Sequence, residues 1–342
     1  MKKIILGMIA ICIAFIANIL FQKTPESVGL SVTFLDVGQG DACVIECGGE
    51  YAMVDGGPTD ASSVVYTYLK NHDIQHIKYM FASHPHEDHI GGLSGALNYA
   101  QVDQLFCSCD SYNSPSFKNL QKYASKQDLS IQVPSVHDKF SLGSALIEVI
   151  GPLVPNNNVN NECLILRITH GDNVFMFTAD AERDEEQSLI DAGVSLSSTV
   201  LKVGHHGSRD ATTYPFLRAI MPTYAVISCG ADNSYGHPTE ETLSRLRDAN
   251  VRLFRTDLQG NITMESNGES LVLKTERNFD IDTIGSGNSA QGTYVLNKRT
   301  MKFHRPECER AQSISPANRE EYTGDRLTLI TQGYSPCGKC DP

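Results

Sequence analysis

Ser83-His84-Pro85-His86-Glu87-Asp88-His89-Ile90-Gly91-Gly92 is the chemically densest stretch of this 342-residue chain. It places three histidines and an aspartate within six positions, directly after the apolar run 79–82. Imidazole nitrogen and carboxylate oxygen bind Zn²⁺, Mn²⁺ and Fe²⁺, and a strand that ends in a tight glycine turn can aim several such ligands at one point. The stretch therefore predicts a metal site rather than a histidine-rich surface loop.

Length and composition are those of a globular protein with room for one large domain and a smaller one. The chain is 41% hydrophobic and 8% aromatic, which is ordinary for a folded protein. Its net charge of −12 argues against a protein that grips nucleic acid by charge alone, because such binding needs Lys and Arg to neutralise phosphates.

The N-terminus has the pattern of a membrane signal. Met1-Lys2-Lys3 precedes an uncharged apolar run over residues 4–21, a length between a signal-peptide core and a full membrane span. No clean cleavage pattern follows, so we expect residues 1–28 to be a retained signal-anchor and a short tether. Lys2 and Lys3 would stay on the cytoplasmic side, which places the remaining chain on the extracytoplasmic face of the cell membrane. Secretion after signal cleavage is the alternative.

From residue 29 onward, strand patterns alternate with helix patterns, which predicts an α/β layered domain over residues 29–276. An alternating stretch from residue 29 breaks at Gly38 and Gly40. Further strands are expected at 43–46, 51–54, 77–82, 102–106, 145–150, 163–168, 174–177, 198–203 and 224–228. Helices are expected at 61–71, 93–100, 116–126 and 239–249.

More candidate site residues follow these strands. Asp180 comes after the expected strand 174–177, and the adjacent pair His205 and His206 comes after the strand 198–203. Successive side chains of a strand point to opposite faces, so only one of the pair is expected to bind metal if the strand persists; His206 is preferred, and His205 stays open. His237 precedes a helix, where it and the backbone N–H groups suit a phosphate contact; a plain turn histidine is the alternative.

The spacing H-x-H-x-D-H-x-G-G resembles the second motif of the metallo-β-lactamase superfamily. The resemblance implies an αββα sandwich with two metal ions. One metal would take His84 and His86, and the other would take Asp88 and His89. The resemblance also makes Asp180 the bridging ligand of the two metals.

Further motifs narrow the resemblance. The sequences 35–41, 177–180, 201–208 and 235–238 look like those of the hydrolase domain of ComEC-type DNA-internalisation proteins, over about residues 29–276. The same resemblance implies that Asp55, which precedes Gly56-Gly57, orients a metal ligand without binding the metal itself. Many superfamily members carry a histidine where this chain has Asn161, so the resemblance implies a weaker, more open first metal site.

The implied function is a metal-dependent hydrolase in which two divalent ions, Zn or Mn, activate water. Asp88 and His237 are the catalytic candidates, with His237 or the unligated member of His205 and His206 stabilising the developing anion. The expected substrate is a phosphodiester such as DNA, a nucleotide or a choline-phosphate group. Alternatives are a β-lactam or lactone hydrolase, and a non-catalytic surface module that binds metal or nucleic acid. Because the aspartate and histidine motifs are complete, we expect an enzyme.

The chain changes character near its C-terminus. Residues 277–292 are rich in Asp, Ser, Gly and Asn and are expected to be a linker, followed by a small module at 293–342. His304-x₃-Cys308 and Cys337-x₂-Cys340 supply two close ligand pairs for one structural Zn. This tail resembles the Ada-type metal-binding module; a disulfide is the alternative. From residue 293 onward eight Lys and Arg outnumber six Asp and Glu, so DNA contact is expected there.

Overall fold

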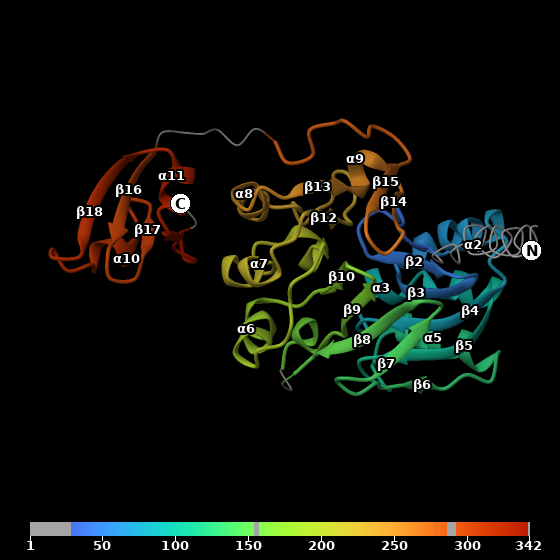
Figure 1. The fold of residues 1–342 in the computed structure, drawn as a ribbon. Helices are drawn as coiled ribbons and strands as arrows, with labels where there is room; N and C mark the ends of the chain where they lie inside the picture. The colour runs from blue at the N-terminus through green and yellow to red at the C-terminus, as the bar shows by residue number, and fades with distance from the viewer. Residues whose placement is uncertain (1–28, 154–156, 286–291, 341–342) are drawn as a thin grey trace, which may run out of the picture.

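The computed structural model describes residues 29–153, 157–285 and 292–340 (Figure 1). The predicted anchor and tether at residues 1–28 lie outside these ranges. Among the residues that are described, we find no helix with the length and apolar character that a membrane crossing needs.

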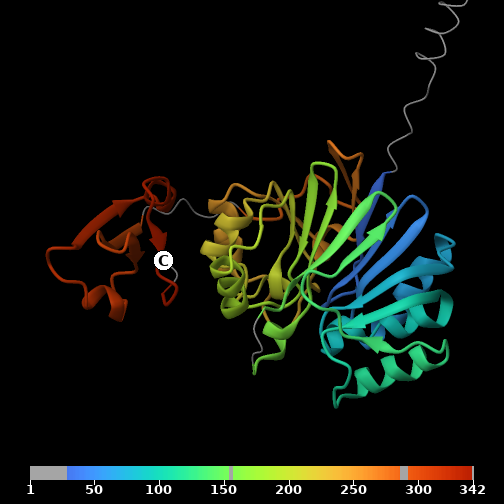
Figure 2. The same cartoon turned by 60° about the horizontal axis from the view of Figure 1, so that its bottom comes forward.

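Two β-sheets packed face to face form the centre of the main domain, residues 29–285 (Figures 1 and 2). The first sheet has the order β15-β14-β1-β2-β3-β4-β5-β6. Its strands are β1 (Leu30–Phe34), β2 (Ala42–Cys47), β3 (Glu50–Gly56), β4 (His76–Ala82), β5 (Gln101–Cys107), β6 (Ile131–Gln132), β14 (Ile262–Ser266) and β15 (Leu271–Thr275). Strands β3 to β6 run parallel, whereas β15, β14, β1, β2 and β3 pair antiparallel.

The second sheet has the order β13-β12-β11-β10-β9-β8-β7. Its strands are β7 (Lys139–Leu142), β8 (Ala145–Gly151), β9 (Ile165–His170), β10 (Asn173–Phe177), β11 (Val200–Lys202), β12 (Tyr224–Ile227) and β13 (Arg252–Arg255). Strands β10 to β13 run parallel, and β7 to β10 pair antiparallel. Both sheets are therefore mixed.

Helices cover the outer face of each sheet. The first sheet carries α2 (Ser62–Asn71), α4 (Leu93–Tyr99) and α5 (Pro115–Ser125), and the second carries α6 (Arg183–Asp191), α7 (Tyr214–Ile220) and α8 (Glu240–Asp248). Short turns of helix are η1 (Thr59–Ala61), α3 (Glu87–Ile90), η2 (Val159–Glu162), η3 (Gly204–Gly207) and α9 (Thr256–Gln259). The inner core joins aromatic side chains of both sheets, with Phe34 stacked on Phe177 at 5.7 Å. This four-layer arrangement confirms the expected α/β sandwich.

A close backbone approach explains the paired glycines of the histidine motif. The amide of Gly92 donates to the carbonyl of Gly57, and a Cβ on Gly92 would lie only 1.9 Å from the carbonyl oxygen of Gly56. No side chain fits there, so glycine lets the loop after β4 dock on the end of β3. The motif loop is thereby fixed to the neighbouring strand.

The predicted linker is wrong in its first half. Residues 277–285 pack on the main domain: the buried Thr283 hydroxyl donates to the carbonyl of Leu253 at 2.6 Å, and Ile284 packs on the core beneath the second sheet. The polar composition of this segment did not indicate that its side chains are buried against the main domain. Residues 286–291 lie outside the described residues.

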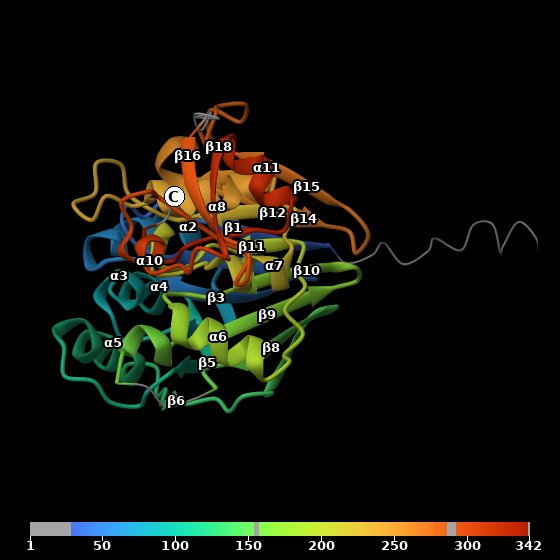
Figure 3. The same cartoon turned by 90° about the vertical axis from the view of Figure 1, so that its left-hand side faces the viewer.

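A C-terminal module follows at residues 292–340. It holds a four-stranded sheet of order β18-β16-β17-β19 and two short helices. The elements are β16 (Gly292–Asn297), β17 (Lys302–His304), α10 (Glu309–Gln312), β18 (Arg319–Gly324), α11 (Arg326–Thr331) and β19 (Ser335–Pro336). Figures 1 and 3 place this module beside α6, α7 and α8. Arg326 of the module pairs with Asp248 at the end of α8.

Candidate metal centre

Four strand ends bring the predicted site residues together. Asp55 lies at the end of β3, His84 follows β4, Asp180 follows β10 and His206 follows β11. The carboxyl ends of parallel neighbours meet at one edge of a sheet, and the two sheets present these edges to each other. Four positions in this region are non-glycine residues with left-handed φ: Asp55 at 58°, Ala179 at 43°, His205 at 47° and His206 at 53°. Strained backbone of this kind typically marks a functional site.

The side chains form two groups of metal-binding atoms that share one carboxylate. Asp88, His89, Asp180 and His206 form one group, and His84, His86 and Asp180 form the other; within each, the candidate atoms lie within 4.8 Å of one another. Oδ1 of Asp180 is 3.2 Å from Nε2 of His89, while its Oδ2 is 3.7 Å from Nε2 of His84. Asp180 therefore stands between the groups, as a bridging ligand would.

Each buried imidazole has its other nitrogen held by a neighbour, which aims Nε2 at the centre. Nδ1 of His89 lies 2.9 Å from Oδ2 of Asp55, and Nδ1 of His84 lies 3.1 Å from the Ser83 hydroxyl. Nδ1 of His206 donates to the carbonyl of Ser228 at 3.0 Å. Partners of this kind fix the ring orientation of metal-binding histidines.

The carboxylates give the centre a strong affinity for positive charge. Burial opposes charge on His206, but Asp180 and Asp41 outweigh burial and raise the pKa of His206 to about 10. Burial also opposes ionisation of Asp88, and the neighbouring imidazoles of His206 and His89 outweigh it, lowering the Asp88 pKa to about 2. The negative charge of these carboxylates favours protonated histidines, and the same charge would attract a metal cation.

Unpartnered buried atoms fit a metal ion in this space. Nε2 of His89, Nε2 of His206 and Oδ1 of Asp180 are fully buried and make no hydrogen bond with any described residue. Buried polar atoms without partners are costly, and three converging on one point need a common partner. The residues present therefore fit two divalent cations, with a nitrogen and oxygen ligand set suited to Zn or Mn.

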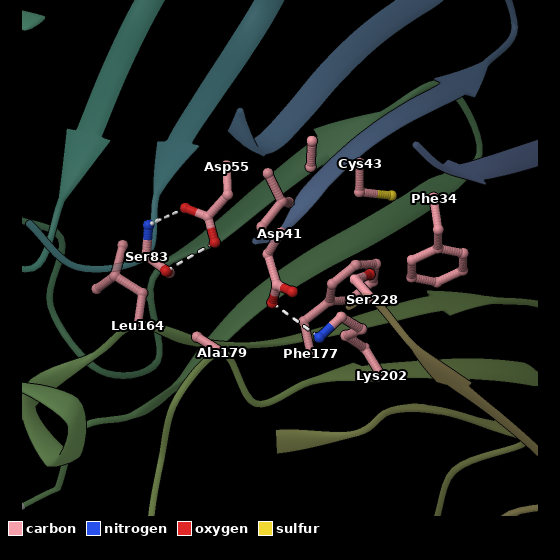
Figure 4. Close-up of a pocket in the computed structure, with 12 residues that line it drawn as sticks. Phe34, Asp41, Cys43, Asp55, Ser83, Leu164, Phe177, Ala179, Lys202 and Ser228 are labelled. Carbon is pink, nitrogen blue, oxygen red and sulfur yellow. Dashed lines mark hydrogen bonds and ion pairs between the residues drawn. The ribbon is translucent and has the colours of Figure 1, made fainter. Parts of the chain in front are cut away.

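A buried ion pair behind the centre was missed at the sequence level. Nζ of Lys202 lies 2.8 Å from Oδ2 of Asp41, whose Oδ1 lies 3.1 Å from Nδ1 of His206. Figure 4 shows Lys202 pointing toward Asp41 in the small pocket between the sheets, next to Asp55 and Ser83. Burial opposes ionisation of Asp41, but Lys202 outweighs it and lowers the Asp41 pKa. The only hint of this ion pair in the sequence is that an acidic residue, Asp41, ends the glycine-containing turn that begins at Gly38.

The strand at 198–203 is shorter than predicted, and this changes the argument about the adjacent histidines. β11 ends at Lys202, and His205 and His206 both take left-handed φ in η3, so they do not alternate across a strand. His206 joins the group around Asp180 and Asp88. His205 lies beside it, with Nδ1 3.4 Å from Oε1 of Glu182 and Nε2 3.6 Å from Oδ2 of Asp180.

Asn161 does not take the position expected of a weak ligand. It is buried, and its Oδ1 accepts a hydrogen bond from the amide of Glu182 at 2.9 Å. Its neighbour Asn160 lines the open pocket instead and donates to Oε1 of Glu182. The reason is the 3₁₀ turn η2, which rotates consecutive side chains in different directions.

An open pocket of about 310 Å³ lies over the centre. Its walls are Gln39, His86, Glu87, Asp88, Asn160, Asp180, His205, His206, Tyr235 and His237. The ring of His237 stacks on Tyr235 and lies 5.7 Å from that of His205. Burial, reinforced by His205, lowers the pKa of His237 to about 4, so its imidazole is neutral. The pocket therefore offers polar groups to a substrate that reaches the centre.

The C-terminal module holds a second cluster. Candidate ligand atoms of His304, Cys308, Cys337 and Cys340 lie within 4.8 Å of one another, and all described cysteines are free thiols. Nδ1 of His304 is buried without a hydrogen-bond partner among the described residues. The convergent thiols and the unpartnered imidazole fit a metal ion such as zinc.

Comparisons with known proteins agree with this geometry. The family model described as "Metallo-beta-lactamase superfamily" matches residues 35–231. ComE operon protein 3 of Bacillus subtilis (strain 168) is 27% identical over 68% of this chain and 32% of its own length. Competence protein ComA of Neisseria gonorrhoeae is 28% identical over 70% of this chain and 32% of its own. The matched segment thus spans about a third of these relatives.

Among solved structures, the metallo-beta-lactamase fold protein YhfI from Bacillus subtilis aligns with a TM-score of 0.49 at 15% identity. The alignment covers 70% of this chain and 100% of that protein.

Proposed function

The chain belongs to the metallo-β-lactamase superfamily, and we propose that it is a metal-dependent phosphodiesterase acting on nucleic acid at the extracytoplasmic face of the cell membrane. The observation that carries the proposal is the position of Asp180 between two groups of nitrogen and oxygen ligand atoms. The competence proteins among its relatives support DNA as the substrate class.

When bound, two divalent cations would activate water for attack and neutralise charge that develops on a phosphoryl group. The chain's own residues then have separate tasks. His84, His86, Asp88, His89, Asp180 and His206 would hold the metals. Asp55, Ser83 and Asp41 fix the ring orientation of these histidines, which keeps the site organised before substrate arrives.

Residues around the open pocket would bind the substrate. His205 lies beside Asp180 without joining its ligand group, so its Nε2 is placed to donate a hydrogen bond to a phosphoryl oxygen. His237, whose neutral ring faces His205, would contact the leaving group. Donors fixed where charge develops lower the barrier because they need no reorganisation during the reaction.

The location rests on the apolar run at residues 4–21, which follows two lysines. A signal-anchor there would hold the domain outside the cytoplasm, where free nucleic acid is available. Expression with a C-terminal reporter, followed by protease treatment of intact cells, tests this. Protection of the module from protease in intact cells would contradict the proposed orientation.

The activity is tested with the purified full chain and its Asp180→Asn variant. Each receives single-stranded DNA, bis(p-nitrophenyl) phosphate or a chromogenic β-lactam, with Mn²⁺ or Zn²⁺. We expect phosphodiester cleavage that Asp180→Asn abolishes and that Asp172→Asn, an exposed turn substitution, leaves intact. Cleavage of the β-lactam without any phosphodiester cleavage would establish acyl hydrolysis instead.

A further inference from the structure

We propose that a basic pocket between the main domain and the C-terminal module binds backbone phosphates of a nucleic-acid strand. The basic pocket is defined by Arg183, Arg218, Arg245 and Lys302. The inference deepens the proposed function and rests on it for the substrate class. It assigns a binding site outside the metal centre and gives the C-terminal module a part in that site.

Both parts of the chain build the walls. The cavity measures about 190 Å³ and is lined by Arg183, Thr213, Tyr214, Pro215, Arg218, Arg245, Lys302, Ser335, Pro336 and Gly338. Arg183 begins α6, Arg218 lies on α7 and Arg245 on α8, whereas Lys302 begins β17 of the module. Gly338 lies against Arg183: a Cβ on this glycine would be 3.1 Å from Nη1 of the arginine.

This pocket is positively charged, although the protein as a whole is negatively charged. The chain carries a net charge of −12, yet no Asp or Glu lines the cavity. Across the described ranges, Arg183, Arg218 and Lys302 form no ion pair, whereas other cations such as Lys78 and Arg255 sit beside carboxylates. Cations that converge without carboxylates leave their charge available to an anionic ligand.

Arg245 adds a charge held in one orientation. It is 3% exposed; its Nε donates to the carbonyl of Glu241 at 3.1 Å and its Nη2 to that of Arg209 at 2.8 Å. The positive charge of Arg245 also interacts with the buried carboxyl of Glu186. That carboxyl accepts hydrogen bonds from the amides of Thr212 and Thr213. A cation fixed by backbone carbonyls has little rotamer entropy left to lose on binding.

The shape and position favour a strand over an isolated anion. Guanidinium groups match phosphate oxygens in a bidentate geometry, and the donors of Arg183, Arg218 and Lys302 together exceed what one phosphate can use. Arg183 is only three residues from Asp180, a chain distance of at most about 11 Å. A strand carries one charge per about 3.4 Å, so it can reach from the basic pocket to the metal centre.

Binding is measured with a fluorescein-labelled 15-nucleotide oligothymidylate, by anisotropy, on the full chain carrying Asp180→Asn to prevent cleavage. The pocket variant is Arg218→Gln with Lys302→Gln, two exposed side chains whose loss leaves the core intact. The control is Lys122→Gln with Lys126→Gln, exposed lysines at the far α5 side that change the net charge equally. We expect the pocket variant to bind about tenfold more weakly and its salt slope to fall by about 1.4.

The outcomes separate this inference from the proposed function, because binding is read without catalysis. Affinity and salt slope that match those of the control variant would overturn the basic pocket as a strand site, even if the wild type cleaves DNA. Inorganic phosphate, added at constant ionic strength, should displace the oligonucleotide only at millimolar concentrations. Displacement by micromolar phosphate would instead establish a site for a free anion.

Discussion

Lys202 and Asp41 form a buried ion pair, with Nζ 2.8 Å from Oδ2, although 160 residues separate them in the chain. Lys202 is at the end of β11 and Asp41 precedes β2, so the pair links the two sheets directly behind the metal centre. Because Asp41 also contacts Nδ1 of His206, the pair connects the core of the sandwich to a predicted ligand.

Removing one partner of this pair should be costly. Lys202→Met leaves the Asp41 carboxylate buried without its cation, which we expect to lower the free energy of unfolding by about 3 to 5 kcal/mol. Adding Asp41→Asn to Lys202→Met should recover part of the loss, because the buried charge is then gone. Urea denaturation of both single variants and the double variant measures this; additive losses would contradict the coupling.

The contact between Asp55 and His89 should matter for catalysis rather than for packing alone. Asp55→Asn keeps the size of the side chain but weakens the hold on Nδ1 of His89, so we expect metal affinity and kcat to fall by about 10- to 100-fold. The matched control is Asp103→Asn, which alters the exposed His76–Asp103 pair, 2.7 Å apart. Equal effects of the two substitutions on metal affinity would rule out a positioning role for Asp55.

The losses of activity caused by substituting two metal ligands should not be additive. His86→Ala and Asp180→Ala each remove a member of the same group, so either one should abolish hydrolysis, and the double variant should be no worse. Steady-state rates on bis(p-nitrophenyl) phosphate check this, with circular dichroism to confirm the fold. A single variant with wild-type activity would refute the two-metal assignment.

Metal content should divide between the two parts of the chain. We expect up to three metal ions in the full chain and the loss of one zinc in Cys337→Ser, which removes a thiol from the module cluster. Elemental analysis measures the loss, with Cys109→Ser, a half-buried thiol outside the cluster, as the control. Unchanged zinc in Cys337→Ser would refute the zinc module.

The contact between α8 and the module should respond to pH. Burial raises the pKa of Asp248 from 3.8 to about 6, with Arg326 opposing the shift. A raised folded-state pKa stabilises the fold below the unfolded pKa of 3.8, and this contribution disappears as pH rises through about 6. The stability advantage of wild type over Asp248→Asn should therefore shrink between pH 4 and pH 7.

Urea unfolding at several pH values measures that advantage. Asp191→Asn, an exposed substitution at the end of α6, serves as the control and should show no such trend. An advantage that grows toward pH 7 would show that the pairing with Arg326 outweighs the burial of Asp248.

The sequence by itself determined the fold class and four of the candidate metal ligands. His84, His86, Asp88 and His89 lie in a single six-residue segment after a strand, and their relative placement depends on local backbone geometry. The alternation of strands and helices predicted the layered α/β fold for the same reason, because each pattern reports only on its own element. Asp180 could also be predicted as a ligand from the sequence, because it directly follows an expected strand.

Only the tertiary structure decided which distant groups meet. The left-handed turn at His205 and His206 places His206 beside Asp88 and Asp180, and the short β11 that permits it was not evident from the residues. The partnership of Lys202 with Asp41 and the basic pocket depend on the packing of one sheet or domain against another. Side chains brought together by such packing leave no spacing pattern in the chain, since their contact is set by the whole sandwich rather than by any one segment.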